Sequence, residues 1–417
     1  MTQLDIQPDD DSMLLVLPVP VRICDGVVLF EAQACNGVER WADNFASLVI
    51  AVPVIPESLV QADGSSAWVD VSALPCRDRV EFVPLPWAYR WATFLKTYSR
   101  TRRTLGDCIA RCRYLQFAFY GLAGDWASVA AREAMWQGRS YAVHTDNVAH
   151  EFSVRSAAGH GRLRRLRARI EAPVMQRYHR GIVRRCTLGL WHGYDCYQAY
   201  SPYCANSHNI HDVHTKPEDA ISEAEYADKA LHALHDPALR VCYVGRVTGI
   251  KAPLDWVRAL AHARDRGAAL RAKWLGDGPL LEEMRALARE LGLGESLDTP
   301  GFVSDRAAVL AALRDAHLLL FTHLTPESPR CLLEALISGT PIAGYGNAFA
   351  TDLVQGHGGG VFVSTGDWRA LGDALVQLAA DRARLSNLIA EAGANGRRFN
   401  DATVFRERSE LIKRYLP

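Results

Sequence analysis

The sequence contains no long hydrophobic run, and its N-terminus does not have the charge of a signal peptide. The longest apolar stretch, residues 13–30, is interrupted by Arg22, Asp25 and two prolines. It therefore lacks the run of about 20 apolar residues that a membrane-spanning helix needs. Residues 9–11 are all aspartates, whereas a signal peptide begins with positive charge. These absences argue against membrane insertion and secretion.

The chain also lacks paired cysteines and an excess of either charge. Its ten cysteines include no C-x-x-C pair, which disfavours a disulfide framework and a thiolate zinc site. Lys and Arg together number 47, as do Asp and Glu, so the whole chain is not an electrostatic nucleic-acid binder. We therefore expect a cytoplasmic protein with reduced thiols and no nucleic-acid partner.

The 417 residues do show a regular alternation of short apolar runs and helical patterns. Such alternation is typical of parallel sheets with helices on both faces. The pattern predicts strands over 14–19, 48–54, 114–120, 140–144, 240–244, 272–275, 317–321 and 341–343. It predicts helices over 125–136, 253–266, 279–291, 305–315 with Ser304 as cap, 330–338, 368–380 and 382–395.

This alternation predicts an α/β fold with two Rossmann-like, doubly wound domains facing across a cleft. We expect an N-terminal domain over 1–225 and a C-terminal domain over 226–395. Residues 396–417 are expected to form a helix that packs back toward the N-terminal domain. Ligands of such sheets bind beyond the carboxyl ends of the strands, so the cleft is the expected site.

Positive charge is concentrated in residues 155–186. This stretch has ten arginines against Glu171 alone, a net charge of +9. On a helix, that density suits anionic lipid headgroups or an anionic acceptor, although a solvated helix face is an equally simple interpretation. RNA is a weaker alternative, because Tyr178 is the only aromatic residue available for base stacking. We expect salt-sensitive, peripheral binding to the inner face of an anionic membrane.

Four short motifs in the second half follow predicted strands or open predicted helices. They are Gly245-Arg246 with Lys251 five residues later, Gly276-Asp277-Gly278-Pro279, the segment 299–303 that contains Phe302, and the segment 325–330 that precedes a helix with Glu334. Cations and helix N-termini suit phosphate, and acidic side chains suit sugar hydroxyls. Each motif alone is common, but together they indicate a sugar-nucleotide site.

With these motifs the sequence resembles the retaining glycosyltransferases of family 4, which have the two-domain GT-B fold. The resemblance implies that Arg246 and Lys251 contact the donor diphosphate and that Glu334 hydrogen-bonds the ribose of UDP or GDP. It also implies that Phe302 flanks the base. We therefore expect donor contacts from Gly26, Gly245, Gly276, Gly278, Phe302, Ser328, Arg330 and Glu334, and catalytic roles for His144, Arg246, Lys251 and Glu327.

The sequence departs from the family pattern at one position. The family has a second glutamate eight positions before Glu334, where this chain has Pro326 and places Glu327 one residue later. In the family, that glutamate contacts the donor sugar. Either Glu327 replaces it or the contact is lost, and we favour replacement. The glycines of the family loop are also missing, so Ser328 and Arg330 must supply its N–H groups.

Two residues of the first half are expected near the donor. His144 ends a predicted strand, and the resemblance implies that it faces the donor sugar and the acceptor. The alternative is a histidine that only satisfies a loop carbonyl. Gly26 is expected in the turn after the first strand, where the family has glycines near the diphosphate. Asp25 beside it fits that pattern less well.

The histidines His208, His211 and His214, with Asp212, have a spacing that a metal site can use. The family needs no metal, and no fixed ligand set is evident. We therefore expect no metal and no cofactor, and a hinge or acceptor-side role for this segment.

The function that follows is a retaining, metal-independent glycosyltransferase. A nucleotide sugar is the donor, and the acceptor is a glycan or a lipid-linked sugar, as in bacterial surface polysaccharide or glycolipid assembly. One alternative is a GT-B sugar-nucleotide epimerase or ring-coupling enzyme. Another is a catalytically silent GT-B binding subunit, suggested by the displaced Glu327.

Overall fold

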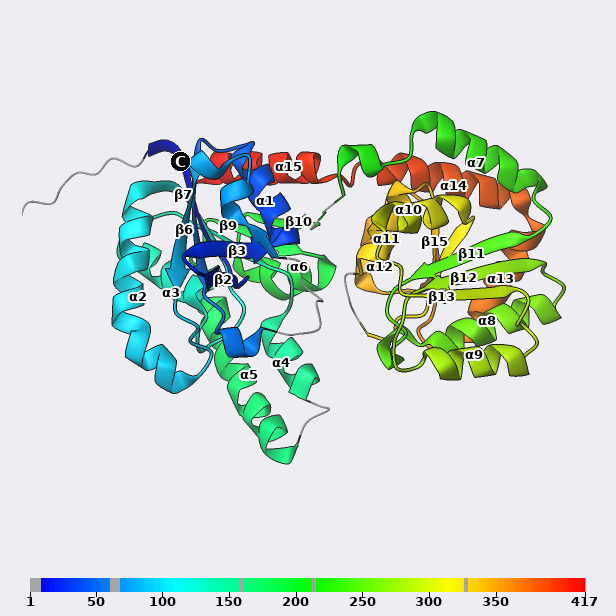
Figure 1. Cartoon of the computed structure of the whole chain (residues 1–417), viewed down its shortest axis with the longest axis horizontal. Coiled ribbons are helices and arrows are strands. Elements are labelled where there is room, and N and C mark those ends of the chain that lie inside the picture. The colour runs from blue at the N-terminus through cyan, green and yellow to red at the C-terminus, as the bar shows by residue number, and fades with distance from the viewer. Residues whose placement is uncertain are drawn as a thin grey trace, which may run out of the picture. The chain divides into compact units, whose positions relative to one another are not determined.

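The chain folds into two α/β units, which we describe from a computed structural model (Figure 1). The structure describes residues 9–60, 68–157, 161–211, 213, 215–325 and 329–416. Unit 1 comprises Met1–His214 and Val404–Pro417, and unit 2 comprises Thr215–Thr403. Among the described residues, no helix is both long and apolar enough to cross a bilayer.

Unit 1 is built on a seven-stranded sheet in which every neighbouring pair is parallel. The strand order is β10-β9-β8-β7-β1-β4-β6. The strands are β1 (Asp9–Val16), β4 (Ser47–Pro53), β6 (Val80–Leu85), β7 (Cys112–Ala118), β8 (Ala142–Thr145), β9 (Leu188–His192) and β10 (Ser207–Ile210). Their carboxyl ends therefore share one edge of the sheet.

Helices cover both faces of this sheet. Successive side chains of a strand point to opposite faces, so Leu14 and Val16 of β1 join one buried cluster and Met13 and Leu15 join the other. The helices are α1 (Ala32–Ala42), α2 (Trp91–Arg111), α3 (Trp126–Trp136), α4 (Ala149–Ala157), α5 (Arg162–Val183) and α6 (Tyr194–Tyr200).

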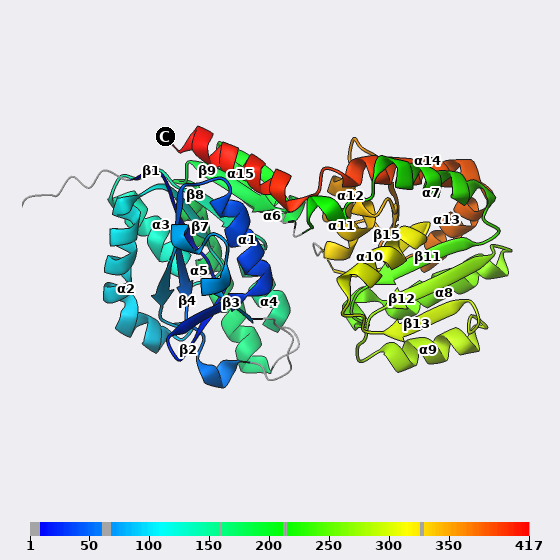
Figure 2. The ribbon, with the colours of Figure 1, turned by 45° about the horizontal axis from the view of Figure 1, so that its top comes forward.

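The last helix of the chain, α15 (Asp401–Tyr415), packs on unit 1. Its Phe405 ring meets Trp41 of α1 edge-on at 5.1 Å between ring centroids. Ile412 and Leu416 are buried in the same cluster as Met13. Helix α15, drawn in red in both views of the ribbon, thus completes one face of the N-terminal sheet (Figure 2).

A small antiparallel sheet in unit 1 contains the turn at Gly26, which was expected directly after the first strand. It consists of β2 (Val21–Cys24), β3 (Val27–Glu31) and β5 (Trp68–Asp70). Asp25 and Gly26 are the two-residue turn between β2 and β3, and both have positive φ, 49° and 80°. Asp-Gly is a preferred sequence for such a hairpin turn. Gly26 therefore lies in a hairpin turn and not directly after β1, and its contact with the donor stays a prediction.

Unit 2 is built on a six-stranded parallel sheet in the order β13-β12-β11-β14-β15-β16. The strands are β11 (Leu239–Val244), β12 (Leu270–Leu275), β13 (Leu297–Gly301), β14 (Leu318–Phe321), β15 (Ile342–Tyr345) and β16 (Gly360–Val363). The helices are α7 (Glu223–His235), α8 (Pro253–Asp265), α9 (Leu281–Glu290), α10 (Arg306–Asp315), α11 (Arg330–Ile337), α12 (Ala348–Val354), α13 (Trp368–Ala380) and α14 (Arg382–Gly396). The prediction of two Rossmann-like, parallel α/β domains is confirmed.

The boundaries between the units differ from the predicted residues 225 and 395. Ile221 already belongs to unit 2, because its N–H donates to the carbonyl of Ile337 at 2.7 Å. The Thr215 hydroxyl donates to the carbonyl of Phe399 at 2.8 Å, which ties the two connecting segments together within unit 2. The second boundary falls inside α15, between Thr403 and Val404.

Candidate functional site

The carboxyl ends of four neighbouring strands of unit 2 are joined by hydrogen bonds. After β11, the Gly245 N–H donates to Leu275 O at 2.9 Å, and after β12, the Gly276 N–H donates to Gly301 O at 2.8 Å. The loop after β14 is joined to the loop after β11, because Leu324 N–H donates to Ile250 O at 2.9 Å. The first three predicted donor-binding motifs, and Leu324 just before the fourth, are thus held at one edge of one sheet, where ligands of such sheets bind.

The glycines of this edge allow the loops to approach one another closely. A Cβ at Gly276 would lie 2.0 Å from the carbonyl oxygen of Gly245, and Gly276 has φ of 156°. A Cβ at Gly278 would lie 2.4 Å from the carbonyl oxygen of Val247. Both close contacts involve backbone atoms, so a side chain at either position would push the strand ends apart.

Gly276→Ala is therefore expected to destabilise unit 2 by about 1–3 kcal/mol, the usual cost of forcing extra atoms into a packed site. Gly294→Ala is the matched control, because a Cβ there has nothing within 4 Å. Chemical denaturation of both variants measures the difference in the free energy of unfolding. Equal stability of the two variants would contradict the close packing of these strand ends.

The two predicted diphosphate ligands lie on the loop after β11. Arg246 is exposed, and Lys251 is half-buried at the end of a short 3-10 turn that leads into α8. The Thr322 hydroxyl, after β14, donates to the carbonyl of Lys251 at 2.8 Å. The backbone that carries Lys251 is therefore fixed from the neighbouring strand.

A buried histidine that the sequence reading missed lies beside this lysine. His323 shares a 2.6 Å hydrogen bond with the Tyr243 hydroxyl. Burial, and to a smaller extent the charge of Lys251, lowers the pKa of His323 to about 3. The imidazole is thus neutral at physiological pH and adds no charge to the site. Its only signal in the sequence is its place two residues beyond the buried strand β14.

Glu334, the predicted ribose contact in α11, is paired with an arginine of the preceding helix, α10. Its Oε1 lies 2.9 Å from Nη1 of Arg306, and its side chain is 17% exposed. Arg306 also pairs with Asp219 at 3.2 Å. Burial alone would lower the pKa of Arg306, but the two carboxylates raise it. A carboxylate offers several acceptor positions, so this ion pair leaves Glu334 able to accept further hydrogen bonds.

The remaining predicted donor residues differ in what the structure says of them. Phe302 directly follows β13 and is 76% exposed. Arg330 is the first residue of α11 and is exposed. Glu327 and Ser328 lie outside the described residues. The roles assigned to all four remain predictions.

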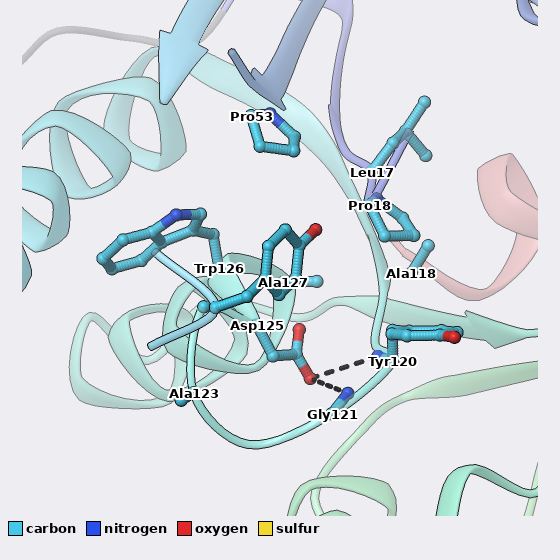
Figure 3. A pocket seen from close by; sticks show the side chains of 12 residues that line it. Leu17, Pro18, Pro53, Ala118, Tyr120, Gly121, Ala123, Asp125, Trp126 and Ala127 are labelled. Atoms are coloured by element: carbon cyan, nitrogen blue, oxygen red, sulfur yellow. Dashed lines mark hydrogen bonds between the residues drawn. The ribbon is translucent and has the colours of Figure 1, made fainter. Parts of the chain in front are cut away.

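In unit 1, His144 lies in β8 and is half-buried, at the carboxyl edge of the seven-stranded sheet. The same edge has a cavity of about 120 Å³ beside the ends of β1, β4 and β7 (Figure 3). Its lining is largely apolar and aromatic and includes Pro18, Pro53, Tyr120 and Trp126.

A buried carboxylate organises the loop around this cavity. Asp125 caps α3 through the Ser128 N–H and also accepts from the N–H groups of Tyr120 and Gly121, each at 3.1 Å (Figure 3). Burial, and then the charge of Asp125, raises the pKa of the nearby Tyr89 to about 12. Tyr89, which also lines the cavity, thus stays protonated over a wider pH range.

Part of the histidine-rich segment lies within the described residues and part lies outside them. His208 lies in β10 with its ring 5.6 Å from that of Tyr415, and burial lowers its pKa. Asp212 and His214 lie outside the described residues. Within the part of the chain that the structure describes, no three His, Cys, Asp or Glu side chains are grouped as metal ligands would be.

Residues 226–398 match the family model described as Glycosyl transferases group 1. Curated relatives also match part of the chain. The 2-deoxystreptamine glucosyltransferase of Streptomyces kanamyceticus is 30% identical over 33% of this chain and 35% of its own length. The putative colanic acid biosynthesis glycosyltransferase WcaL of Escherichia coli K12 is 27% identical over 42% of this chain and 45% of its own. The matches therefore span less than half of these relatives.

Solved structures resemble the whole chain. Anabaena HepE in complex with UDP has a TM-score of 0.63 at 14% identity, covering 97% of this chain and 100% of its own. The apo lipopolysaccharide outer core galactosyltransferase WaaB has a TM-score of 0.64 at 14% identity, covering 97% and 99%. Likenesses at this identity show the fold, which is GT-B.

Proposed function

We propose that the protein is a retaining, metal-independent glycosyltransferase of family 4. It transfers a sugar from a UDP-sugar or GDP-sugar donor to an acceptor hydroxyl. The observation that carries this proposal is the edge of the unit 2 sheet, where hydrogen-bonded loops bring Gly245-Arg246, Lys251 and Gly276-Asp277-Gly278 together. The match of residues 226–398 to group 1 glycosyl transferases supports it.

In the proposed complex, the donor diphosphate lies against Arg246, Lys251 and the N-terminus of α11. Free N–H groups at a helix N-terminus and cationic side chains both favour the negative charge that develops on the leaving nucleotide. Glu334, oriented by Arg306, accepts from the ribose hydroxyls. Phe302 flanks the base, and Glu327 contacts the donor sugar. Known structures named as complexes of HepE with UDP and with UDP-glucose support a nucleotide-sugar donor.

The acceptor is proposed to bind at the carboxyl edge of the unit 1 sheet, near His144 and the aromatic cavity beside Asp125. Aromatic rings and a protonated tyrosine suit a sugar, which has both apolar faces and hydroxyls. With no carboxylate assigned as a nucleophile, we propose front-face attack, in which the leaving phosphate accepts the proton of the acceptor hydroxyl. Positioning and charge stabilisation are then the contributions of the protein.

Bacterial surface polysaccharide or glycolipid assembly is the proposed setting. The curated relatives named for colanic acid and amylovoran biosynthesis, and the lipopolysaccharide galactosyltransferase among the structural neighbours, support it. We propose a cytoplasmic enzyme that meets a lipid-linked acceptor at the inner face of the membrane.

The test is release of UDP or GDP from a panel of sugar donors, with and without glycan acceptors. We expect acceptor-dependent release with one donor, and a product whose anomeric configuration matches that of the donor by NMR. An inverted product would overturn the retaining mechanism. Donor epimerisation without transfer would favour an epimerase, and no nucleotide binding at all would favour a silent subunit.

Chelation by EDTA is expected to leave activity essentially unchanged. The positive charge that a metal ion would bring is supplied by Arg246, Lys251 and the N-terminus of α11. Direct chromatographic measurement of released nucleotide is the suitable assay, since coupling enzymes often need magnesium themselves. Loss of activity that one divalent ion restores would contradict the prediction and direct attention back to His208 and His211.

A further inference from the structure

Helix α5 has two apolar faces, and only one of them packs inside unit 1. Ala168, Ala172, Met175 and His179 are buried on the inner face. The opposite face has four large apolar side chains with exposed fractions of 85%, 57%, 61% and 57%: Leu163, Leu166, Ile170 and Val174. At about 100° per residue, these four positions fall within an arc of about 80°. We call them the outer stripe.

Arginines surround the outer stripe. Six residues of α5 combine full positive charge with an exposed position: Arg162, Arg164, Arg165, Arg167, Arg169 and Arg177. The single acidic residue of the helix, Glu171, is paired with Arg167 at 2.9 Å. Isolated exposed apolar residues are ordinary on protein surfaces, but an aligned row flanked by an excess of cations is not.

The neighbouring helix α4 extends this surface. Helices α4 and α5 pack against each other, and in Figure 1 they project together from unit 1. Phe152 of α4 is 45% exposed. Between the two helices is a hollow of about 600 Å³, and its lining includes Ser153, Ser156, Arg164, Arg167 and Glu171. Guanidinium and hydroxyl donors suit a phosphate group.

We propose that the outer stripe inserts into the interface of an anionic phospholipid bilayer, with the surrounding arginines on the lipid phosphates. A helix that lies in a membrane interface has this composition, with an apolar face in the acyl boundary and cations at the headgroups. Charge complementarity selects a bilayer over a second copy of this chain, because two copies would bring like-charged arginine rows together. This binding goes beyond the proposed transfer reaction and does not depend on it.

Vesicle co-sedimentation of the full chain, without donor or acceptor, tests the proposal. We expect binding to vesicles of phosphatidylcholine with phosphatidylglycerol to exceed binding to phosphatidylcholine alone by roughly tenfold or more. The triple variant Leu163→Ser, Leu166→Ser, Ile170→Ser is expected to lose roughly tenfold or more of the binding to anionic vesicles. Leu231→Ser on α7 is the matched control, since Leu231 is also an exposed leucine, at 60%.

Salt separates the two contributions. Screening acts over about 8 Å at physiological ionic strength, so high salt is expected to weaken the arginine contacts more than the apolar insertion. The wild type is then expected to retain more binding at high salt than the triple variant. Thermal unfolding checks that the triple variant is folded, which the outward position of all three side chains favours.

Three results would overturn the proposal. They are equal partitioning of the wild type onto neutral and anionic vesicles, wild-type binding by the triple variant, and a dimer in vesicle-free solution that the triple variant abolishes. Because no nucleotide is present, any of them would leave the proposed transfer reaction standing. Conversely, a chain without transferase activity would still be expected to bind these vesicles.

Discussion

Replacing Arg246 or Lys251 by alanine is expected to reduce sugar transfer by about 100- to 1,000-fold, the usual effect of losing one group that stabilises transition-state charge. Both cations belong to the loop after β11, and the backbone of Lys251 is held by Thr322 from the next strand. The backbone that carries Lys251 is therefore fixed before the donor arrives. Turnover at saturating donor is the quantity to measure, since these cations act on the leaving diphosphate.

Arg271→Ala is the matched control for this prediction. Arg271 is an exposed cation of the same sheet, but it lies near the amino end of β12, at the opposite edge. We expect near-normal turnover for the control. We also expect a wild-type fold for all three variants, because Arg246 and Arg271 are exposed and Lys251 is only half-buried. Near-normal turnover of Arg246→Ala or Lys251→Ala would show that the diphosphate binds elsewhere.

The variants Glu327→Gln and Glu334→Gln are expected to differ in what they reduce, turnover in one and nucleotide affinity in the other. Each reduction is expected to be about ten- to a hundredfold, because a charge-assisted hydrogen bond is lost. Glu334→Gln is expected to weaken the binding of free UDP or GDP, since its carboxylate is assigned to the ribose. Glu327→Gln is expected to reduce turnover and leave nucleotide affinity nearly unchanged, since Glu327 is assigned to the sugar. Calorimetry of nucleotide binding, alongside kcat for each variant, separates the two roles.

Arg306 supplies the control for Glu334. The variant Arg306→Ala keeps the glutamate and removes the partner 2.9 Å away, so it is expected to weaken nucleotide binding less than Glu334→Gln does. Arg306→Lys is expected to restore part of the loss. Should Glu327→Gln match the wild type in both measurements, the donor sugar must be held by other groups, and the case for an altered site would be stronger.

The parallel α/β units could be predicted because their elements are local and strongly patterned. Trp368–Ala380 is a helix with the predicted ends, and its start is fixed by the Asp367 side chain, which accepts from the Ala370 N–H. A similar cap was assigned to the wrong residue in α10, where Asp305 and not Ser304 accepts from the Ala307 N–H. Adjacent residues of nearly equal capping ability cannot be ranked from sequence alone.

Features that depend on contacts between distant residues could not be predicted from the sequence. Strand β13 contains Pro300, which argues against a strand until the sheet order shows that β13 is an edge strand, where proline is tolerated. The pairing of Arg306 with Glu334 joins residues 28 positions apart. Asp25-Gly26 was recognised as a turn, but only the antiparallel partners on each side identify it as a hairpin.

The return of α15 to unit 1 also sets an order for folding during synthesis. Residues of unit 2 leave the ribosome after most of unit 1 but before Phe405, Ile412 and Leu416, which are buried with Met13 and Trp41. Until those three side chains emerge, the part of the N-terminal sheet and of α1 that α15 covers stays exposed to water. The C-terminal unit can therefore reach its final fold first, although domains usually fold in the order of translation. A nascent chain stalled before residue 404 would leave unit 1 open to chaperones and proteases.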